Sequence, residues 1–229
     1  MNDIFEIRPI AKIRTGFKTK FGIPRQSNLV HGVKGKIVFQ PEFRNIDALK
    51  GLENYSYIWL IWGFSAIKEN KWSPTVRPPR LGGNKRVGVF ASRSPFRPNS
   101  LGLSSVKLEK IEIDPIDGPV LIVSGVDLMD ETPIFDIKPY IKPDIHDTGL
   151  FGISDTIPER RLKVEFPNDL ETIIPLDQLT DIKEVLSLDP SPSYQDDPER
   201  VYGMEFYGKE IRFKKTKEVI YVISVEDIN

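Results

Sequence analysis

The pattern of short apolar runs over the first 140 residues constrains the fold more than any other feature of this sequence. Some of these runs alternate apolar with polar side chains, which is the period of a β-strand that buries one face, and the others are short and continuously apolar. Clusters of Pro, Gly and Asn separate the runs, and these residues favour turns. Strands this short, with turns this frequent, predict a mainly β chain built on a small antiparallel barrel or a closed sandwich. The predicted strands are residues 5–13, 35–40, 57–64, 87–91, 103–113 and 120–127, with a short helix at 47–54.

The sequence changes character after Tyr140. Residues 142–158 are polar and rich in Pro and Gly, which predicts a linker. From Leu150 to the C-terminus there are 17 acidic and 10 basic residues, so this region carries a local charge of −7. Its apolar pattern predicts one helix and a small sheet, with a hairpin turn at Tyr207-Gly208-Lys209. The predicted elements are a helix at 175–188 and strands at 200–207, 209–214 and 219–225.

These patterns predict a division of the chain into two domains of different class. The first is an antiparallel β-barrel domain at residues 1–142, followed by a linker at 143–158. The second is a small α+β domain at residues 159–229.

The composition excludes several kinds of chemistry. The 229 residues include no cysteine and only two histidines, His31 and His146, both in predicted loops. Disulfides and thiolate catalysis are therefore excluded, and we expect no metal site. GxSxG, Walker A and a GxGxxG opening a helix are also absent, which argues against a hydrolase triad, a P-loop and a Rossmann site. The remaining possibility is chemistry that depends on alignment, such as methyl transfer from a sulfonium donor.

The N-terminus and the longest apolar run bear on location. The first ten residues contain acids where a signal peptide would have a basic and an apolar region. The apolar run at residues 58–64 is far too short to span a membrane. We therefore expect a cytoplasmic protein without a membrane partner.

An acid-free basic stretch is the strongest functional signal. Between Asn70 and Leu108 there is no Asp or Glu, but there are eight Lys and Arg residues in a chain of net charge −1. Five prolines in the same stretch place these cations on rigid turns. Arginine forks suit phosphate and carboxylate groups, so the stretch predicts an anionic partner. A solvated basic surface is the alternative interpretation.

Three segments could together form a site. Phe21–Gln26 places an Arg and a Gln on a Gly-Pro turn, and Arg77–Leu103 contributes the basic turns. Gly125–Tyr140 gathers four carboxylates near Lys138 at a strand end, where they could bind ribose hydroxyls or accept protons. Taken singly, the first and third segments could also be ordinary solvated turns.

Together these segments resemble the TsaA-like (TrmO) family of tRNA methyltransferases over about residues 5–142. The matching strings are KFGIPRQ at 20–26, PEF at 41–43, GLENYSYIWLIWGF at 51–64, VRPPRLGGNKRVGVFASRSPFRPNSLGLS at 76–104 and DLMDETPIFDIKPY at 127–140. DPSPSYQ at 189–195, followed by Tyr202, is similar to the C-terminal domain of bacterial members.

The resemblance implies an S-adenosyl-L-methionine (AdoMet)-dependent enzyme with a β-barrel catalytic domain. It implies a homodimer that holds the cofactor near the subunit interface, and a tRNA substrate. The methyl acceptor would be N6 of threonylcarbamoyl-adenosine, next to the anticodon. By position, the implied cofactor contacts are Pro24, Arg25, Gln26, Ser65, Ala66, Arg93, Leu103, Asp127, Leu128, Met129 and Asp130.

Several positions depart from the family pattern. His is common where Tyr57 and Ser65 stand, and Gly is usual at Glu131. The change at Ser65 makes that cofactor contact the least secure, and Glu131 adds a charge beside the expected pocket.

The implied reaction suggests roles for further residues. Phe96 or Tyr140 would stack on the purine, and Arg86 or Arg97 would bind the threonyl carboxylate. Arg77 and Arg80 complete the predicted substrate contacts. Asp136 would remove or orient the N6 proton while Lys138 steadies the developing charge, which makes Asp136, Lys138 and Tyr140 the predicted catalytic residues. A non-catalytic RNA-binding module is the main alternative, and arginine turns that only join a dimer are a third interpretation.

Overall fold

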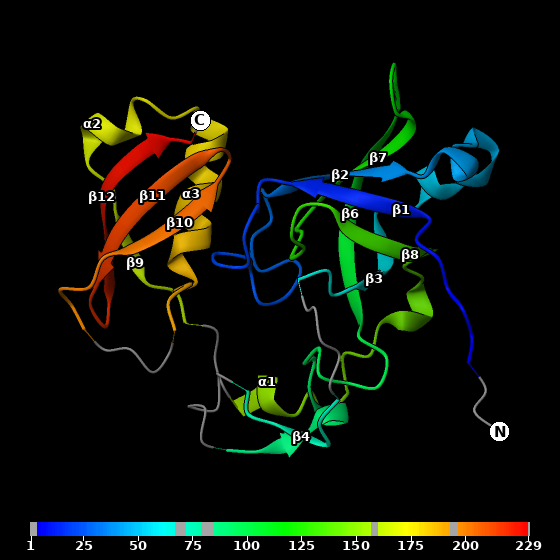
Figure 1. Ribbon diagram of the computed structural model, residues 1–229, viewed down its shortest axis with the longest axis horizontal. Coiled ribbons are helices and arrows are strands. Elements are labelled where there is room, and N and C mark those ends of the chain that lie inside the picture. The colour runs from blue at the N-terminus through cyan, green and yellow to red at the C-terminus, as the bar shows by residue number, and fades with distance from the viewer. Residues whose placement is uncertain (1–3, 67–71, 79–84, 157–159, 193–196, 229) are drawn as a thin grey trace.

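The structure is a computed structural model that describes residues 4–66, 72–78, 85–156, 160–192 and 197–228. It consists of a β-barrel and a smaller C-terminal unit, defined here as residues 160–228, which lie beside each other (Figure 1). The mainly β prediction is confirmed. Among the described residues, no helix is long and apolar enough to cross a membrane.

Six antiparallel strands close into the barrel in the order β1-β2-β7-β6-β3-β8, and β8 pairs back with β1. Alternate residues of these strands point inward, and the fully buried ones are mostly branched aliphatic side chains, as a narrow barrel requires. The strands are β1 (Ala11–Thr15), β2 (Lys34–Phe39), β3 (Tyr57–Gly63), β6 (Leu101–Asp114), β7 (Gly118–Ser124) and β8 (Thr132–Pro139).

Three details of the barrel differ from the sequence prediction. The first strand begins at Ala11, because Ile4, Phe5 and Ile7 are exposed and no strand pairs with them. The strand that closes the barrel, β8, was not predicted as a separate strand, since Pro133, Pro139 and two charged residues interrupt its apolar pattern. The run at 87–91 forms only a two-residue strand and a 3-10 turn.

Short elements connect the barrel strands or follow the last of them. The predicted helix at 47–54 is two 3-10 turns instead, because Gly51, with φ 89°, interrupts it. The elements are the 3-10 turns η1 (Pro41–Phe43), η2 (Ile46–Leu49), η3 (Leu52–Asn54), η5 (Val89–Ala91) and η6 (Lys142–Asp144), the paired strands β4 (Thr75–Val76) and β5 (Val87–Gly88), and helix α1 (Ile153–Thr156).

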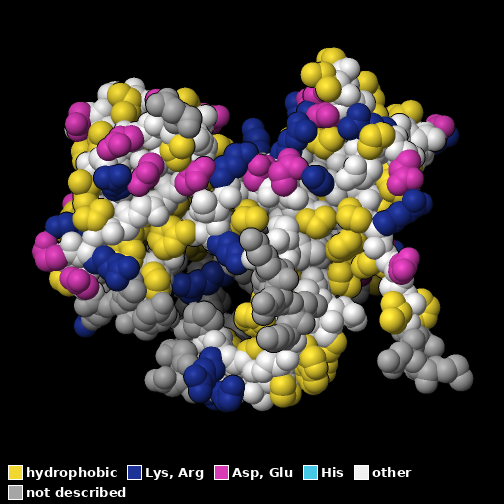
Figure 2. Space-filling model, in the orientation of Figure 1, with side chains coloured by type: hydrophobic (Ala, Val, Ile, Leu, Met, Phe, Trp, Pro, Cys, Tyr) yellow, Lys and Arg dark blue, Asp and Glu magenta, His cyan; other side chains and the backbone are white. Residues whose placement is uncertain are grey.

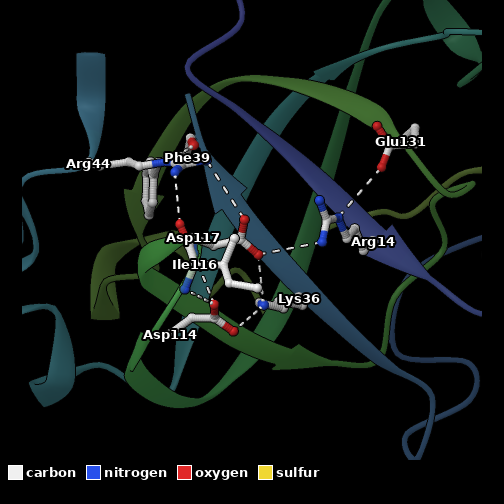
Figure 3. Close-up of polar contacts among 8 residues, drawn as sticks. All are labelled: Arg14, Lys36, Phe39, Arg44, Asp114, Ile116, Asp117 and Glu131. Atoms are coloured by element: carbon white, nitrogen blue, oxygen red, sulfur yellow. Dashed lines mark hydrogen bonds and ion pairs between the residues drawn. The ribbon is translucent and has the colours of Figure 1, made fainter. Parts of the chain in front are cut away.

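A buried carboxylate holds the β6–β7 hairpin to the neighbouring strands (Figure 3). The side chain of Asp117 is 9% exposed and accepts from Lys36 at 2.9 Å and Arg14 at 3.5 Å, with Arg44 at 3.8 Å. Lys36 also contacts Asp114 at 2.6 Å and lowers the pKa of that carboxyl. Several cations around one buried anion offset its desolvation, and they fix the register of the turn.

The C-terminal unit is a four-stranded sheet covered by one helix. The predicted helix is confirmed as α3 (Leu176–Ser187), and the three predicted strands are β10 (Tyr202–Phe206), β11 (Lys209–Lys215) and β12 (Val219–Asp227). Tyr207 and Gly208 both have positive φ, as a two-residue hairpin turn requires. A short strand that the sequence did not predict, β9 (Lys163–Glu165), pairs in parallel with β12, and α2 (Asn168–Glu171) precedes α3.

The segment between β1 and β2, residues 16–33, lies between the barrel and the C-terminal unit (Figure 1). Its Phe17 is fully buried and stacks on Phe206 of β10, with ring centroids 4.5 Å apart. One continuous group of buried apolar side chains therefore runs from the barrel into the C-terminal unit.

Candidate cofactor and substrate site

A cavity of about 840 Å³ opens where four segments, distant in sequence, meet at one end of the barrel. This volume is within the usual range for a small-molecule site. The segments are the β1–β2 loop, the end of β3 with the residues after it, the turns that lead into β6, and the connection from β7 to β8. The lining residues are Lys20, Ile23, Pro24, Arg25, Gln26, Trp62, Phe64, Ser65, Ala66, Ser92, Arg93, Pro95, Phe96, Arg97, Leu101, Gly102, Leu103, Asp127, Met129 and Thr132. The three segments singled out in the sequence thus share one cavity.

An aromatic pair forms one wall of this cavity. The rings of Trp62 and Phe64 lie 4.4 Å apart, and the Trp62 indole donates to Ser104 at 3.0 Å. The Trp62 ring lies against the backbone of Gly102, where any side chain would overlap it. Gly102 is therefore required for the indole to reach the cavity.

Two arginines of the basic stretch have different surroundings. Arg93 is exposed and donates to the side chain of Gln26 at 2.6 Å, which joins the basic turns to the β1–β2 loop. Arg97 is half-buried and donates to the carbonyls of Ser92 at 3.0 Å and Ser94 at 3.3 Å. Arg97 therefore holds the shape of its own turn. Figure 2 shows Lys and Arg side chains at the hollow between the barrel and the C-terminal unit.

Asp127 is the most perturbed acid of the cavity. Its Oδ1 atom is fully buried and has no hydrogen-bond partner among the residues that the structure describes. Burial raises the pKa of this carboxyl to about 6, although a hydrogen bond from Ser104 and the positive charge of Arg93 oppose the shift. An unpaired buried oxygen at a cavity wall is costly, and it calls for a donor from a bound molecule.

Nine of the eleven predicted cofactor contacts line the cavity. The other two, Leu128 and Asp130, do not, because alternate residues of this extended segment face opposite sides. Leu128 lies in the core, and Asp130 accepts from Lys18 at 2.5 Å and from the backbone of Thr15 at 2.9 Å. Ser65 lies at the wall despite its departure from the family pattern.

The predicted substrate contacts are only partly brought together. Phe96 and Arg97 line the cavity, and Phe96 is 46% exposed. Arg77 and Arg86 are exposed and lie outside the lining. Arg80 lies outside the residues that the structure describes.

The three predicted catalytic residues lie outside this cavity in a single copy of the chain. On β8, Asp136 pairs with Lys138 at 2.9 Å, and both are largely exposed. Tyr140 packs against Trp59, with ring centroids 5.2 Å apart, and lines a separate hollow with Tyr57. These residues could meet a molecule in the cavity only if they belonged to a second copy.

Glu131 does not face the cavity. It has φ 61°, a conformation that favours Gly, and its carboxylate lies 3.1 Å from Lys12 and 3.7 Å from Arg14. The added charge is therefore balanced by two cations of β1, outside the cavity lining.

Sequence reasoning missed Trp62, Phe64, Lys20 and Thr132. An aromatic residue within a strand pattern usually indicates core packing, so Trp62 carried no distinct signal. Lys20 is the first residue of the quoted KFGIPRQ string and could have been included among the cofactor contacts. Among the residues described, no three potential metal ligands lie close together.

Comparisons with known proteins agree with this arrangement. The family described as tRNA-methyltransferase O N-terminal domain matches residues 12–144, and the TrmO C-terminal domain family matches residues 159–228. The tRNA (adenine(37)-N6)-methyltransferase of Escherichia coli (strain K12) is 36% identical over 232 residues, which cover 97% of this chain and 98% of that protein. A Pseudomonas aeruginosa protein named as a putative S-adenosylmethionine-dependent methyltransferase is 38% identical, covering 96% of both chains. The crystal structure of TrmO from Pseudomonas aeruginosa matches with a TM-score of 0.78 at 30% identity, covering 98% of this chain and 100% of that one.

Proposed function

The chain belongs to the tRNA-methyltransferase O family, and from this premise we infer that it is an AdoMet-dependent tRNA (adenine-N6)-methyltransferase. We propose that its acceptor is N6 of threonylcarbamoyl-adenosine beside the anticodon. The tRNA substrate implies a cytoplasmic location. We propose that the barrel domain spans residues 1–142, the linker residues 143–158 and the C-terminal domain residues 159–229.

The cavity supports AdoMet as the cofactor. Its aromatic wall at Trp62 and Phe64 suits a purine, and the unpaired Oδ1 of Asp127 suits the hydroxyl or amino donors of a nucleoside. This unpaired oxygen is the observation that carries the proposal. Bound AdoMet would supply an electrophilic methyl group, and the protein would supply alignment. Pro24, Arg25, Gln26, Ser65, Ala66, Arg93, Leu103 and Met129 would complete the cofactor contacts.

The basic turns would bind the modified nucleoside. An unpaired anticodon-loop base is accessible without opening a duplex, so the cost of extruding it is low. Phe96, exposed at the cavity rim, would stack on the purine. Arg86 is a better candidate than Arg97 for the threonyl carboxylate, because Arg97 already donates to two main-chain carbonyls.

The predicted catalytic residues can reach the cavity only if two copies of the chain build one site together. We propose a homodimer in which Asp136, Lys138 and Tyr140 of one copy face the cavity of the other. Leu101 and Leu103 support this proposal, since they are 36% and 48% exposed at the cavity rim and apolar enough to pack against a second copy. In the dimer, Asp136 would orient the N6 proton and Lys138 would stabilise the developing charge.

Complementation tests the shared site. Asp127→Asn and Lys138→Ala chains are mixed at limiting AdoMet, where each alone should be nearly inactive, to form heterodimers in which one of two sites is intact. Because half of a random mixture is heterodimer, we expect about a quarter of wild-type activity. No recovery in a proven heterodimer would contradict a site built from two copies.

Methyl transfer to defined tRNA tests the activity itself. Labelled AdoMet should methylate tRNA that carries threonylcarbamoyl-adenosine and leave the unmodified transcript unlabelled. Equal labelling of both would refute the carboxylate recognition. An RNA-binding module without catalysis would give no heat with AdoMet in calorimetry, although it would still bind tRNA with a steep salt dependence.

A further inference from the structure

We propose that the C-terminal unit is the scaffold that positions the cofactor loop, defined as residues 16–33. This inference rests on the proposed function, because the loop contributes Lys20 and residues 23–26 to the cavity wall. Its physical basis is that one side of the loop lines the cavity while the other side packs on β10, β11 and α3.

Aromatic stacking joins the loop to the sheet at two places. Phe17 stacks on Phe206 with ring centroids 4.5 Å apart and planes inclined by 14°, and both rings are fully buried. Phe21 stacks on Phe213 at 6.4 Å. Such pairs add to the stabilisation from burial and restrict the orientation of the loop.

Close backbone contacts lie between these pairs. Gly22, with φ 94°, is buried against the side chain of Met204, and a Cβ at this position would overlap the Met204 sulfur. Gly16 lies equally close to the rings of Phe206 and Tyr207, where a Cβ would be 2.8 Å and 2.9 Å away. The loop therefore follows the surface of β10 with no space between them.

Hydrogen bonds fix the remaining length of the loop. Arg161 donates to the carbonyl of Leu29 at 2.6 Å, and Arg25 donates to the carbonyl of Asp189 at 3.5 Å. On the barrel side, Asn28 donates to the carbonyl of Ser105 at 3.0 Å. Pro24 and Gln26 lie between these attachments, so the C-terminal unit defines where they face the cavity.

Charge argues against phosphate binding as the main role of this unit. Its basic cluster is neutralised locally, since Lys214 pairs with Glu199 at 2.7 Å and Lys215 pairs with Asp189 at 2.9 Å. A surface of paired cations attracts RNA weakly. Loosening the scaffold should therefore weaken AdoMet binding and leave tRNA binding intact.

The test compares two substitutions in the full-length chain that remove the same number of buried atoms. Met204→Ala removes three atoms at the loop contact, and Ile220→Ala removes three atoms from β12, two strands away from β10. Met204→Leu conserves volume and serves as the rescue variant. AdoMet binding is measured by calorimetry without tRNA, tRNA binding by filter retention, and stability by urea unfolding.

We expect Met204→Ala to raise the Kd for AdoMet about five- to tenfold, because a loop that is competent in only a tenth to a fifth of molecules weakens apparent affinity by that factor. Ile220→Ala should lose comparable stability but keep the Kd within about twofold, and Met204→Leu should behave like wild type. Amides of the cofactor loop should exchange faster in Met204→Ala, with the barrel unchanged.

Three outcomes would overturn the scaffold role. These are an unchanged Kd in Met204→Ala, an equal rise in both Ala variants, or a loss of tRNA affinity that exceeds the loss for AdoMet. If Met204→Ala does not fold, Arg161→Gln tests the same contact at the surface, and it should raise the Kd for AdoMet about twofold or more. Failure of the wild-type chain to bind AdoMet would instead refute the proposed function.

Discussion

Replacing Asp127 by Asn tests the most specific feature of the cavity. The buried Oδ1 has no partner in the described part of the chain, and burial raises the pKa of the carboxyl from its ordinary value of 3.8 to about 6. At about 1.4 kcal/mol for each pH unit, this difference corresponds to a penalty of about 3 kcal/mol when the group is ionised. The neutral amide of Asn has nearly the same shape and carries no such penalty.

The penalty has a defined pH window. Below about pH 4 the carboxyl is protonated in both folded and unfolded protein, so it costs nothing. As the pH rises from about 4 to 6, the unfolded chain loses this proton first, and the folded state is destabilised until the folded group is also ionised. Above about pH 6 the penalty is complete and constant.

Urea unfolding without AdoMet, at several pH values between 4 and 7.5, measures this effect. We expect Asp127→Asn to be more stable than wild type by about 1–3 kcal/mol at pH 7.5 and by little at pH 4, since the Asn amide must itself find partners. AdoMet affinity should fall about tenfold, because the neutral amide oxygen of Asn is a weaker acceptor than the carboxylate. A variant that is less stable at every pH would show that Oδ1 also has a partner in the protein, and the cofactor argument would fail.

Three further substitutions test the structure. Glu131→Gly should raise Tm by up to about 3 °C in calorimetry, since relief of a positive φ outweighs two exposed ion pairs; a lower Tm would contradict this. Tyr207→Phe should cost about 2 kcal/mol in urea unfolding, because buried Asp181 loses a donor at 2.5 Å; no change would mean that water replaces it. Asp117→Asn should cost about 2 kcal/mol with an unchanged m-value, because Lys36 and Arg14 lose the buried anion that they contact; an altered m-value would indicate that the hairpin unfolds separately.

Much of the architecture could be predicted because its signals are local. Alternation along β6 and the short apolar runs of β2, β3 and β7 are typical of strands, and the apolar stripe of α3 specifies a helix. The Tyr207-Gly208 turn was recognisable because few residues tolerate positive φ. Motif spacing likewise identified most of the residues that line the cavity.

Other features depended on contacts between distant segments. The closing strand β8 has a weak pattern of its own, and only its pairing with β1 and β3 makes it part of the barrel. The segment that leads into β8 places Asp127 and Met129 at the cavity and Leu128 in the core. Motif matching cannot distinguish these orientations.

Composition, periodicity and turn residues determined that this chain forms short strands with a basic, proline-stiffened segment between them. Only the tertiary structure decided that Asp127 has an unpaired buried oxygen, that Trp62 lies at the cavity wall, and that the C-terminal unit packs on the cofactor loop. The physical reason is that burial and desolvation belong to the packed assembly of segments, whereas strand and turn propensities belong to each segment alone.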